Sequence, residues 1–222
     1  MFTGLIEAVC EVRSVRATGG AMRLSVDLGK LAPASNKRGQ ADESKIGDSI
    51  AINGVCLTVA KLDGNLAEFD VSSETLKKSA LGKLKPASQV NTELSMKATD
   101  RFGGHIVQGH IDGVATIKAI DRQGQFANIK FAADSELLGQ MVVKGSVAVD
   151  GISLTVADMD QTSFSAAIIP ETLEKTTLGK AKIGDVVNIE TDIIAKIIKK
   201  QLDKILPPAE KLSVERLKEL GF

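Results

Sequence analysis

The sequence contains no tryptophan and no tyrosine, and seven phenylalanines make up its whole aromatic content of 3%. Proteins that bind single-stranded nucleic acid usually stack the bases on aromatic side chains in a basic groove. The 28 basic and 28 acidic side chains cancel, so the chain has no excess charge that would attract a polyanion. We therefore expect neither nucleic acid nor an anionic membrane surface as a partner.

Long apolar runs are also missing. No segment approaches the roughly 18 apolar residues of a membrane span. The opening MFTGLIEAVCEVRS lacks the basic leader and apolar run of a signal peptide. With 43% apolar and 25% charged residues, the composition is that of an ordinary globular protein, and we expect it in the cytoplasm.

Cysteine and histidine are scarce, with two residues of each. Cys10 and Cys56 allow one disulfide at most, and they form neither a disulfide framework nor a zinc motif. His105 and His110 lie five apart in GGHIVQGH, a poor spacing for a helical metal site. We expect no metal, and we treat both cysteines as thiols.

What the chain does contain is an internal repeat. The segment GDSIAINGVCLTV recurs as KGSVAVDGISLTV, and ETLKKSALGK recurs as ETLEKTTLGK, both at an offset of 97 residues. The opening FTGLIEAV matches VQGHIDGV at an offset of 105 residues. The eight extra residues of the first copy fall in the polar stretch 34–45, which we predict to be a surface loop.

Each copy consists of short runs of alternating apolar residues separated by Gly, Asp and Asn, a pattern typical of antiparallel strands. One helix-compatible segment follows in each copy, beginning near Ser73 or Pro170. Roughly six strands in so short a copy favour a closed barrel, because closure removes exposed sheet edges. We predict an all-β fold of two tandem six-stranded barrels, an N-terminal one over 1–97 and a C-terminal one over 98–192.

The segment 193–222 has a different pattern. In DIIAKIIKKQLDKIL the isoleucines and Leu202 recur at helical spacing with lysines between them, which predicts a C-terminal α-helix with one apolar face. This face either caps its own barrel or mediates self-association. The tail after Pro208, KLSVERLKELGF, resembles a further short helix whose role the sequence does not reveal.

The duplicated strand directs polar side chains to one side. Alternation sends the apolar Val55, Leu57 and Val59 into the barrel, so Cys56 and Thr58 share the opposite face. We call these two residues the first ledge, and their counterparts Ser153 and Thr155 the second ledge. A glycine beside each ledge would let a flat ligand approach the backbone. Two similar ledges could bind two molecules of one compound, although such alternation is also ordinary strand chemistry.

Two positions break the internal symmetry. His110 matches Leu5, and the thiol of Cys56 matches the hydroxyl of Ser153, which suggests different roles for the two halves. A histidine can exchange protons near neutral pH or serve as a buried structural donor, and both readings stay open. A nucleophilic thiol needs a lowered pKa, and no sequence neighbour of Cys56 guarantees one.

These motifs together resemble the riboflavin synthase family. MFTGLIE, the pair NGVCLTV and DGISLTV, GGHIVQGHID, the paired ETL and LGK, and VNIE occur in the family's order over nearly the whole chain. The chain departs from the family pattern at Cys10, where glycine is usual, in the longer 34–45 loop, and at Lys85-Pro86.

The resemblance implies two six-stranded Greek-key barrels and a C-terminal helix through which three subunits associate. It implies that two molecules of 6,7-dimethyl-8-ribityllumazine dismutate to riboflavin and 5-amino-6-ribitylamino-2,4-pyrimidinedione without a cofactor, the last step of riboflavin biosynthesis. The reaction site would lie between the N-terminal barrel of one subunit and the C-terminal barrel of its neighbour. Association with lumazine synthase is left open.

The resemblance also assigns roles to individual residues. The expected catalytic group comprises Ser49, Cys56, His110 and Ser153. Substrate contacts are expected from two sets of residues: Thr58, Thr155, Thr75, Ile169 and Thr172 for the rings and ribityl chains, and Lys144, Asp150 and Asp192 as polar partners. Phe2 would bring the N-terminal segment towards the site. Whether Cys56 forms a covalent bond, and whether a hydride shift precedes carbon–carbon bond formation, stays open.

Two rival functions are weighed against this one. A non-catalytic lumazine or flavin-binding protein would share the duplicated barrels but lack function at one ledge, whereas here both ledges and His110 are present. The flavin-binding barrel of ferredoxin reductases resembles one copy, but its Arg-x-Tyr-Ser motif cannot occur in a chain without tyrosine.

Overall fold

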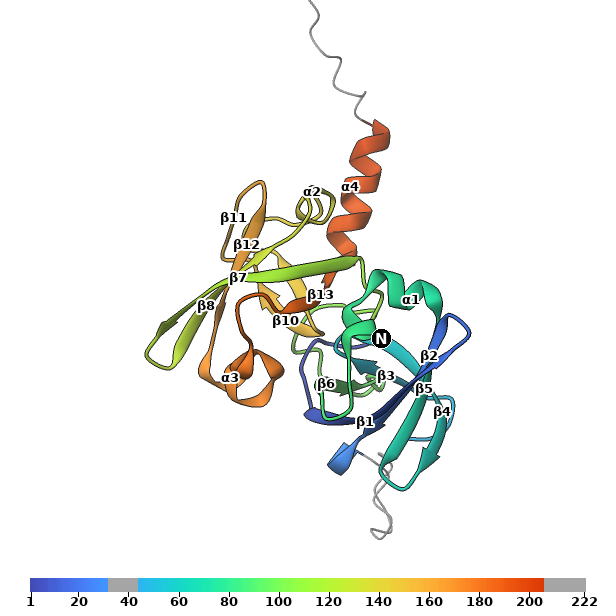
Figure 1. The fold of residues 1–222 in the computed structure, drawn as a ribbon. Helices are drawn as coiled ribbons and strands as arrows, with labels where there is room; N and C mark the ends of the chain where they lie inside the picture. Colours follow the sequence, from blue (N-terminus) through green and yellow to red (C-terminus); the bar gives the residue numbers. More distant parts are fainter. Residues whose placement is uncertain (32–43, 206–222) are drawn as a thin grey trace, which may run out of the picture.

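In the computed structural model, which describes residues 1–31 and 44–205, two β-barrel units lie side by side and a helix follows the second (Figure 1). The first unit contains these elements: β1 (Ala8–Thr18), β2 (Ala21–Asp27), η1 (Gly29–Leu31), β3 (Ser49–Ile52), β4 (Val55–Asp63), β5 (Leu66–Val71), α1 (Ser73–Lys78), η2 (Ala80–Lys83) and β6 (Gln89–Leu94). The second contains these: β7 (Gly113–Gln123), β8 (Phe126–Ala132), α2 (Ser135–Leu138), β9 (Ser146–Val149), β10 (Ile152–Thr155), β11 (Asp158–Met159), β12 (Ser163–Ile168), α3 (Pro170–Lys175), η3 (Thr177–Lys180) and β13 (Val186–Thr191). The chain continues into α4 (Ile193–Ile205).

The first unit is a closed antiparallel barrel with strand order β1-β2-β5-β4-β3-β6. The predicted all-β class is therefore confirmed as mostly β with a few short helices, and the predicted six-stranded barrel is confirmed for the first repeat. Closure leaves no unpaired edge, and the alternating side chains of every strand point either into the barrel or out of it.

The second unit repeats this order with two differences: one strand is divided, and the strands form an open sheet instead of a closed barrel. Its sheet runs β10-β9-β13-β7-β8-β12-β11, because the strand equivalent to β4 is divided into β10 and β11. The predicted tandem barrels are thus present, the first closed with six strands and the second a half-barrel in which the same strand positions count as seven. The division falls where β4 has a bulge between Val59 and Lys61. At the matching point Val156 donates its N–H to Gly145 and Ala157 donates to Ser165, so successive residues pair with different neighbours.

The interior of each barrel is apolar, as the alternation predicts. Val55, Leu57 and Val59 are all at least 96% buried. In the second barrel the rings of Phe131 and Phe164 stack with centroids 5.0 Å apart. Burying side chains of this size stabilises the fold by about 1.5–3 kcal/mol each.

The two barrels meet backbone to backbone at a pair of two-residue hairpin turns. Asn53 and Gly54 connect β3 to β4, Asp150 and Gly151 connect β9 to β10, and all four residues have positive φ. A Cβ added to Gly54 would lie 2.6 Å from the Gly151 nitrogen, and one added to Gly151 would lie 2.8 Å from the Gly54 nitrogen. Only glycine fits at either position.

Two buried asparagines tie the repeats together reciprocally. The Asn91 side chain donates to the Asp150 carbonyl at 3.0 Å and accepts from the Thr177 N–H at 2.9 Å. The Asn188 side chain donates to the Asn53 carbonyl at 2.8 Å, and it accepts from the N–H of residue 80 at 2.6 Å. Each asparagine thus satisfies backbone groups of the other repeat that would otherwise be buried without partners.

Helix α4 projects away from the second barrel (Figure 1). Lys196 anchors its first turns through an ion pair to Asp112 at 2.8 Å. The predicted apolar face is present and about half exposed or more; it comprises Ile194, Ile197, Ile198, Leu202 and Ile205. None of the helices in the described part of the chain is long and apolar enough to cross a membrane.

Two predictions lie outside the described residues: most of the surface loop over 34–45, and the short helix in the tail after Pro208.

The turn contact can be tested by substitution. Gly54→Ala should lower the free energy of unfolding by about 3 kcal/mol, of which ~1 reflects the left-handed backbone and ~2 the overlap with Gly151. Gly64→Ala is the matched control, because Gly64 also has positive φ but has no atom within 4 Å of its added Cβ. Chemical denaturation measures both, and equal losses would show that the contact between the turns does not limit stability.

Candidate active site

The two ledges lie on the outer faces of equivalent hairpins. In the first barrel Ser49 pairs with Thr58 and Ala51 with Cys56, so Ser49 joins the first ledge on one side of the sheet. In the second barrel Thr155 pairs with Ser146, and Ser153 with Ala148. Thr58 and Thr155 are exposed, and Cys56 and Ser153 are half-buried. Their polar groups are thus accessible while the intervening residues fill the barrels.

Each ledge is completed by a segment of the other repeat. We call residues 2–5 the N-terminal arm and residues 107–110 the linker arm. The arms pair with each other through Phe2 and Val107, at 2.7 and 3.2 Å. The Ser153 N–H donates to the Gly4 carbonyl at 2.8 Å, and the Cys56 N–H donates to the Gly109 carbonyl at 2.9 Å. The arms are therefore exchanged between the barrels.

Glycine is required where each arm touches a ledge. Gly4 and Gly109 have φ of +79° and +81°. An added Cβ would lie 2.6 Å from the Ser153 Cβ at the first position, and 2.5 Å from the Cys56 Cβ at the second. Each arm therefore lies flat against its ledge, and the next residue, Leu5 or His110, is exposed beside it.

This arrangement brings His110 to the edge of the first ledge. Its backbone N–H donates to Glu190, and the preceding Gly109 contacts Cys56, so the exposed imidazole follows directly after the contact with the ledge. The first ledge thus combines the two hydroxyls of Ser49 and Thr58, a thiol and an exposed imidazole. The equivalent place on the second ledge holds Leu5, which cannot exchange protons.

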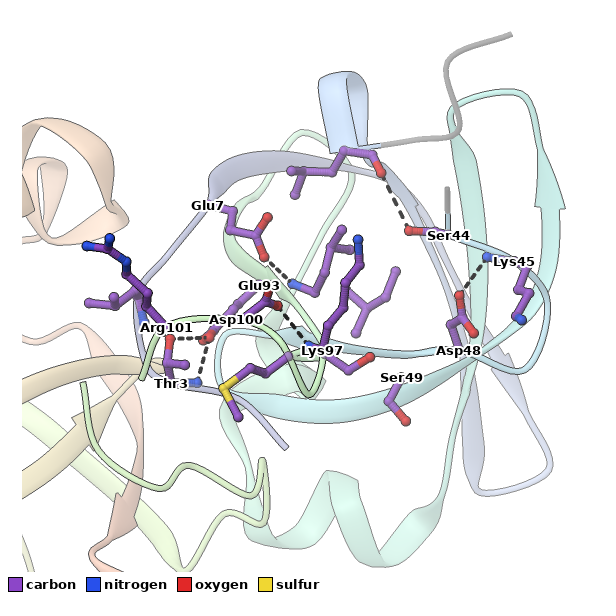
Figure 2. Close-up of a pocket in the computed structure, with 16 residues that line it drawn as sticks. Thr3, Glu7, Ser44, Lys45, Asp48, Ser49, Glu93, Lys97, Asp100 and Arg101 are labelled. Atoms are coloured by element: carbon purple, nitrogen blue, oxygen red, sulfur yellow. Dashed lines mark hydrogen bonds between the residues drawn. The ribbon is translucent and has the colours of Figure 1, made fainter. Parts of the chain in front are cut away.

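A buried glutamate holds each arm. The Glu93 carboxylate accepts hydrogen bonds from Thr3 and Gly4, marked by dashed lines at Thr3 in Figure 2. The Glu190 carboxylate accepts from three successive N–H groups, those of residues 108, 109 and 110. Burial raises the pKa of both carboxyls, and these hydrogen bonds act against that shift by favouring the charged form.

The second ledge contains a histidine that the sequence reasoning missed. The His105 Nδ1 lies 2.7 Å from the Ser153 hydroxyl. Burial lowers the pKa of His105, and the nearby Asp192 carboxylate raises it by a smaller amount. Its Nε2 is buried without a hydrogen-bond partner in the described part of the chain. Comparing the two repeats could not identify His105, because the matched segment of the second copy begins only at Val107.

Asp192 and Lys144 flank the second ledge. Asp192 connects β13 to α4, and its carboxylate accepts the Ile194 N–H at 2.8 Å. Lys144 lies in the turn before β9 with φ of +68°, and its N–H donates to Val156. Its side chain is exposed.

The remaining predicted ligand contacts lie at the starts of α1 and α3. The Thr75 hydroxyl lies 2.9 Å from that of Ser72, the N-cap of α1. Ile169 is the N-cap of α3 and is 54% exposed, and Thr172 lies in the first turn of that helix. Helix α1 follows β5, which runs antiparallel to the ledge strand β4, so α1 begins towards the end of β4 that carries Cys56. Helix α3 follows β12, which runs antiparallel to β11, the second part of the divided ledge strand.

Two predicted residues lie between the barrels. The Phe2 side chain is 99% buried in a small cluster with Ala51, Val107 and Ala148, so it anchors the N-terminal arm. Asp150 is buried in the turn that meets Gly54, and its carboxylate accepts the Asn188 N–H at 2.7 Å. Burial raises the pKa of Asp150 to about 7.

A cavity of about 700 Å³ lies beside Ser49 (Figure 2). The N-terminal arm contributes Thr3 and Leu5 to its wall, β6 contributes Glu93, and the segment 95–97 with Asp100 and Arg101 covers one side. This volume is within the range of roughly 300–1,000 Å³ found for small-molecule sites. Among residues 1–31 and 44–205, no group of three His, Cys, Asp or Glu side chains is arranged to hold a metal ion.

The family model for the lumazine binding domain matches the chain twice, over residues 3–95 and 108–192. Riboflavin synthase of Actinobacillus pleuropneumoniae is 41% identical, with all of both chains covered. Riboflavin synthase of Photobacterium phosphoreum is 40% identical over 100% of this chain and 99% of its own. The enzyme of Bacillus subtilis strain 168 is 38% identical over 92% and 91%.

Solved structures show the same fold. LumP complexed with riboflavin has a TM-score of 0.77 at 20% identity, over 86% of this chain and 99% of its own. LumP complexed with 6,7-dimethyl-8-(1'-D-ribityl) lumazine has a TM-score of 0.75 at 19% identity, with the same coverage.

The paired barrels with their two ledges therefore define a protein built from two lumazine binding domains. Within that class the chain belongs to the riboflavin synthases, a family of enzymes, as its full-length similarity to them shows.

The buried Asp150 makes stability depend on pH. Its folded-state pKa of about 7 is above the ordinary 3.8, so the folded state holds the proton more tightly, and stability falls as pH rises from about 4 to 7. Asp150→Asn should remove this dependence, because Asn53 occupies the matching position in the first repeat. We expect the variant to be more stable than wild type by a few kcal/mol near pH ~8, and to have no advantage near pH ~4.

Urea denaturation across this pH range measures the effect. Asp63→Asn, which changes an exposed carboxylate in the first repeat, should leave the profile unchanged. A wild-type profile that runs parallel to that of Asp150→Asn over the whole range would show that burial does not raise the pKa of Asp150.

Proposed function

We propose that the chain dismutates two molecules of 6,7-dimethyl-8-ribityllumazine to riboflavin and 5-amino-6-ribitylamino-2,4-pyrimidinedione, without a cofactor, as the last step of riboflavin biosynthesis. One observation carries this proposal: a single chain presents two homologous ledges, each completed by an exchanged arm, with different reactive groups on the two. A dismutation needs two molecules of one compound in unequal roles. The two homologous ledges could bind two such molecules, and their different reactive groups could give the molecules unequal roles.

In the proposed reaction, a proton leaves the C7 methyl group of one lumazine, and the resulting carbanion attacks its partner. Ser49, Cys56 and His110 would handle protons and activate the nucleophile at the first ledge, with Thr58 and Thr75 binding the substrate. At the second ledge Ser153 would be the catalytic hydroxyl. Residues proposed to bind the second substrate are Thr155, Ile169, Thr172, Lys144 and Asp192, whereas Asp150, which is buried between the barrels, would only hold the turn beside this ledge. Phe2 would act by anchoring the N-terminal arm.

To this set we add His105. Its lowered pKa keeps the imidazole neutral at neutral pH, where Nδ1 can exchange a hydrogen bond with Ser153 at 2.7 Å. Holding two rings in a fixed orientation can lower a barrier by about 7–11 kcal/mol when the geometry is ideal. Much of the rate would then come from orientation, so single side-chain losses should be modest.

We also propose a division into an N-terminal barrel domain (1–97), a C-terminal barrel domain (98–192) and a helical segment (193–222) that joins three chains into a homotrimer. The exposed apolar face of α4 supports the assembly, and the open ledges suit a site covered by a neighbouring copy. The absence of a disulfide between Cys10 and Cys56 is consistent with a reducing compartment such as the cytoplasm. Lumazine synthase is a further candidate partner.

The principal alternative is a binding protein without turnover, and the likeness to LumP complexes favours it as the second candidate. The deciding experiment incubates the pure protein, without added cofactor or metal, with 6,7-dimethyl-8-ribityllumazine. Chromatography should show riboflavin and the pyrimidinedione in equal amounts, with two lumazines consumed per riboflavin. Tight binding without turnover would overturn the proposal and support the binding protein.

Cys56→Ser should retain partial turnover, because the second ledge already uses a hydroxyl at the matching position. We expect kcat to fall by about 10-fold to 100-fold, less than the roughly 100-fold to 10,000-fold that a positioned proton-transfer group contributes, because the serine hydroxyl can still transfer a proton. Steady-state kinetics on lumazine measure the effect. Complete loss of turnover at unchanged substrate affinity would contradict this expectation and identify an obligatory thiol.

A further inference from the structure

The exchange of arms separates the residue that holds each arm from the ledge that the arm completes. Glu93 belongs to β6 of the first barrel, yet the arm it holds lies against Ser153 of the second. Glu190 belongs to β13 of the second barrel, yet its arm lies against Cys56 of the first. Each glutamate therefore lies in one barrel while its effect is expected in the other.

The contacts are dense enough for such a role. The Glu190 carboxylate accepts three backbone N–H groups at 2.6, 2.8 and 3.1 Å, which fixes three consecutive residues of the linker arm. Glu93 accepts the Thr3 N–H at 2.6 Å, the Thr3 hydroxyl at 2.7 Å and the Gly4 N–H at 3.0 Å. Both residues are almost fully buried. Hydrogen bonds to a charged acceptor are stronger than neutral ones, and at the buried Thr3, Gly4 and Gly109 no water can replace them.

On the second ledge the chain of contacts continues to the histidine. The Thr3 carbonyl accepts the His105 N–H at 3.1 Å. A Cβ on Gly104 would lie 2.0 Å from that same oxygen, so the backbone around His105 packs directly on Thr3. Glu93 therefore supports both the arm over Ser153 and the histidine that contacts the Ser153 hydroxyl.

We propose that Glu93 and Glu190 are positioning residues that act across the repeat boundary, with Glu190 setting the geometry of the Cys56 ledge and Glu93 that of the Ser153 ledge. The relevance to turnover rests on the proposed function, in which both ledges bind lumazine. The positioning of the arms does not rest on the proposed function, because it concerns only how closely each arm covers its ledge.

Thiol reactivity tests the crossed dependence without any substrate. Cys56 is half-buried beneath the linker arm, whereas Cys10 is 96% buried in the first barrel, so iodoacetamide should report mainly on Cys56. Glu190→Gln replaces one of the two acceptor oxygens with an NH2 donor that faces backbone N–H groups, and it should loosen the linker arm. We expect Cys56 alkylation to accelerate by about tenfold in this variant, and Glu93→Gln to leave it within about twofold of wild type.

The same alkylation measurement is applied to the second ledge after the thiol at position 56 is removed and a thiol is introduced at position 153. In a Cys56→Ser, Ser153→Cys background, Glu93→Gln should accelerate alkylation by about tenfold, and Glu190→Gln should have little effect. Mass spectrometry assigns the alkylated residue. The two glutamates thus serve as matched controls for each other, since both make three hydrogen bonds at equivalent places in the repeat.

A merely structural role would give a different pattern. If each glutamate stabilised its own barrel, Glu190→Gln would accelerate alkylation of the thiol introduced at position 153 and spare Cys56, and a general loss of stability would accelerate both; either result overturns the proposal. Thermal unfolding checks that the variants are folded. If one is not, Gly109→Ala and Gly4→Ala displace the same arms by overlap with Cys56 and residue 153, and they must show the same crossed pattern.

The lumazine assay separates this inference from the proposed function. Crossed alkylation in a protein that never forms riboflavin would leave the positioning role intact and refute the enzymatic one. Turnover with uncrossed alkylation would do the reverse.

Discussion

The backbone contact between the Gly54 and Gly151 turns is the constraint on which the remaining structure depends. It leaves no space for a side chain on either residue, so it sets the distance between the two hairpins that carry the ledges. At that distance Asn91 and Asn188 each reach a carbonyl of the opposite turn, and Phe2 and Val107 fill the remaining space. The arms can then span from one barrel to the other.

Exchange of the arms makes buried charge tolerable. A carboxylate removed from water costs several kcal/mol unless hydrogen bonds replace its hydration. Glu93 and Glu190 obtain those bonds from arm N–H groups, which themselves have no strand partner at these positions. Each carboxylate and its arm therefore satisfy one another, and removing either would leave the other buried and unpaired. This mutual dependence explains why the arms adopt one defined path.

The sequence predicted the duplication, the barrels and the orientation of the ledges, because strand alternation and repeated motifs are local signals. It could not predict the exchange of arms, since matching Gly4 with Gly109 aligns two segments without saying which barrel each one touches. His105 was missed because it has no counterpart in the first copy. The division of the fourth strand into β10 and β11 depends on a bulge, and nothing in the alternation marks that residue. Long-range geometry, rather than pattern, decided these features.

The contacts between the repeats have the form of a two-fold interface within one chain. Gly4 of the first repeat contacts Ser153 of the second, and the matching Gly109 of the second repeat contacts Cys56 of the first. The same pair of surfaces therefore meets twice, as in an isologous dimer. Two identical chains joined in this way would have identical ledges. Covalent linkage removes that restriction, because Cys56 and Ser153, or Leu5 and His110, can differ without disturbing the shared scaffold. Unequal roles for two equal substrates require such a difference, and the fused repeat supplies it while the turn contact keeps both ledges in register.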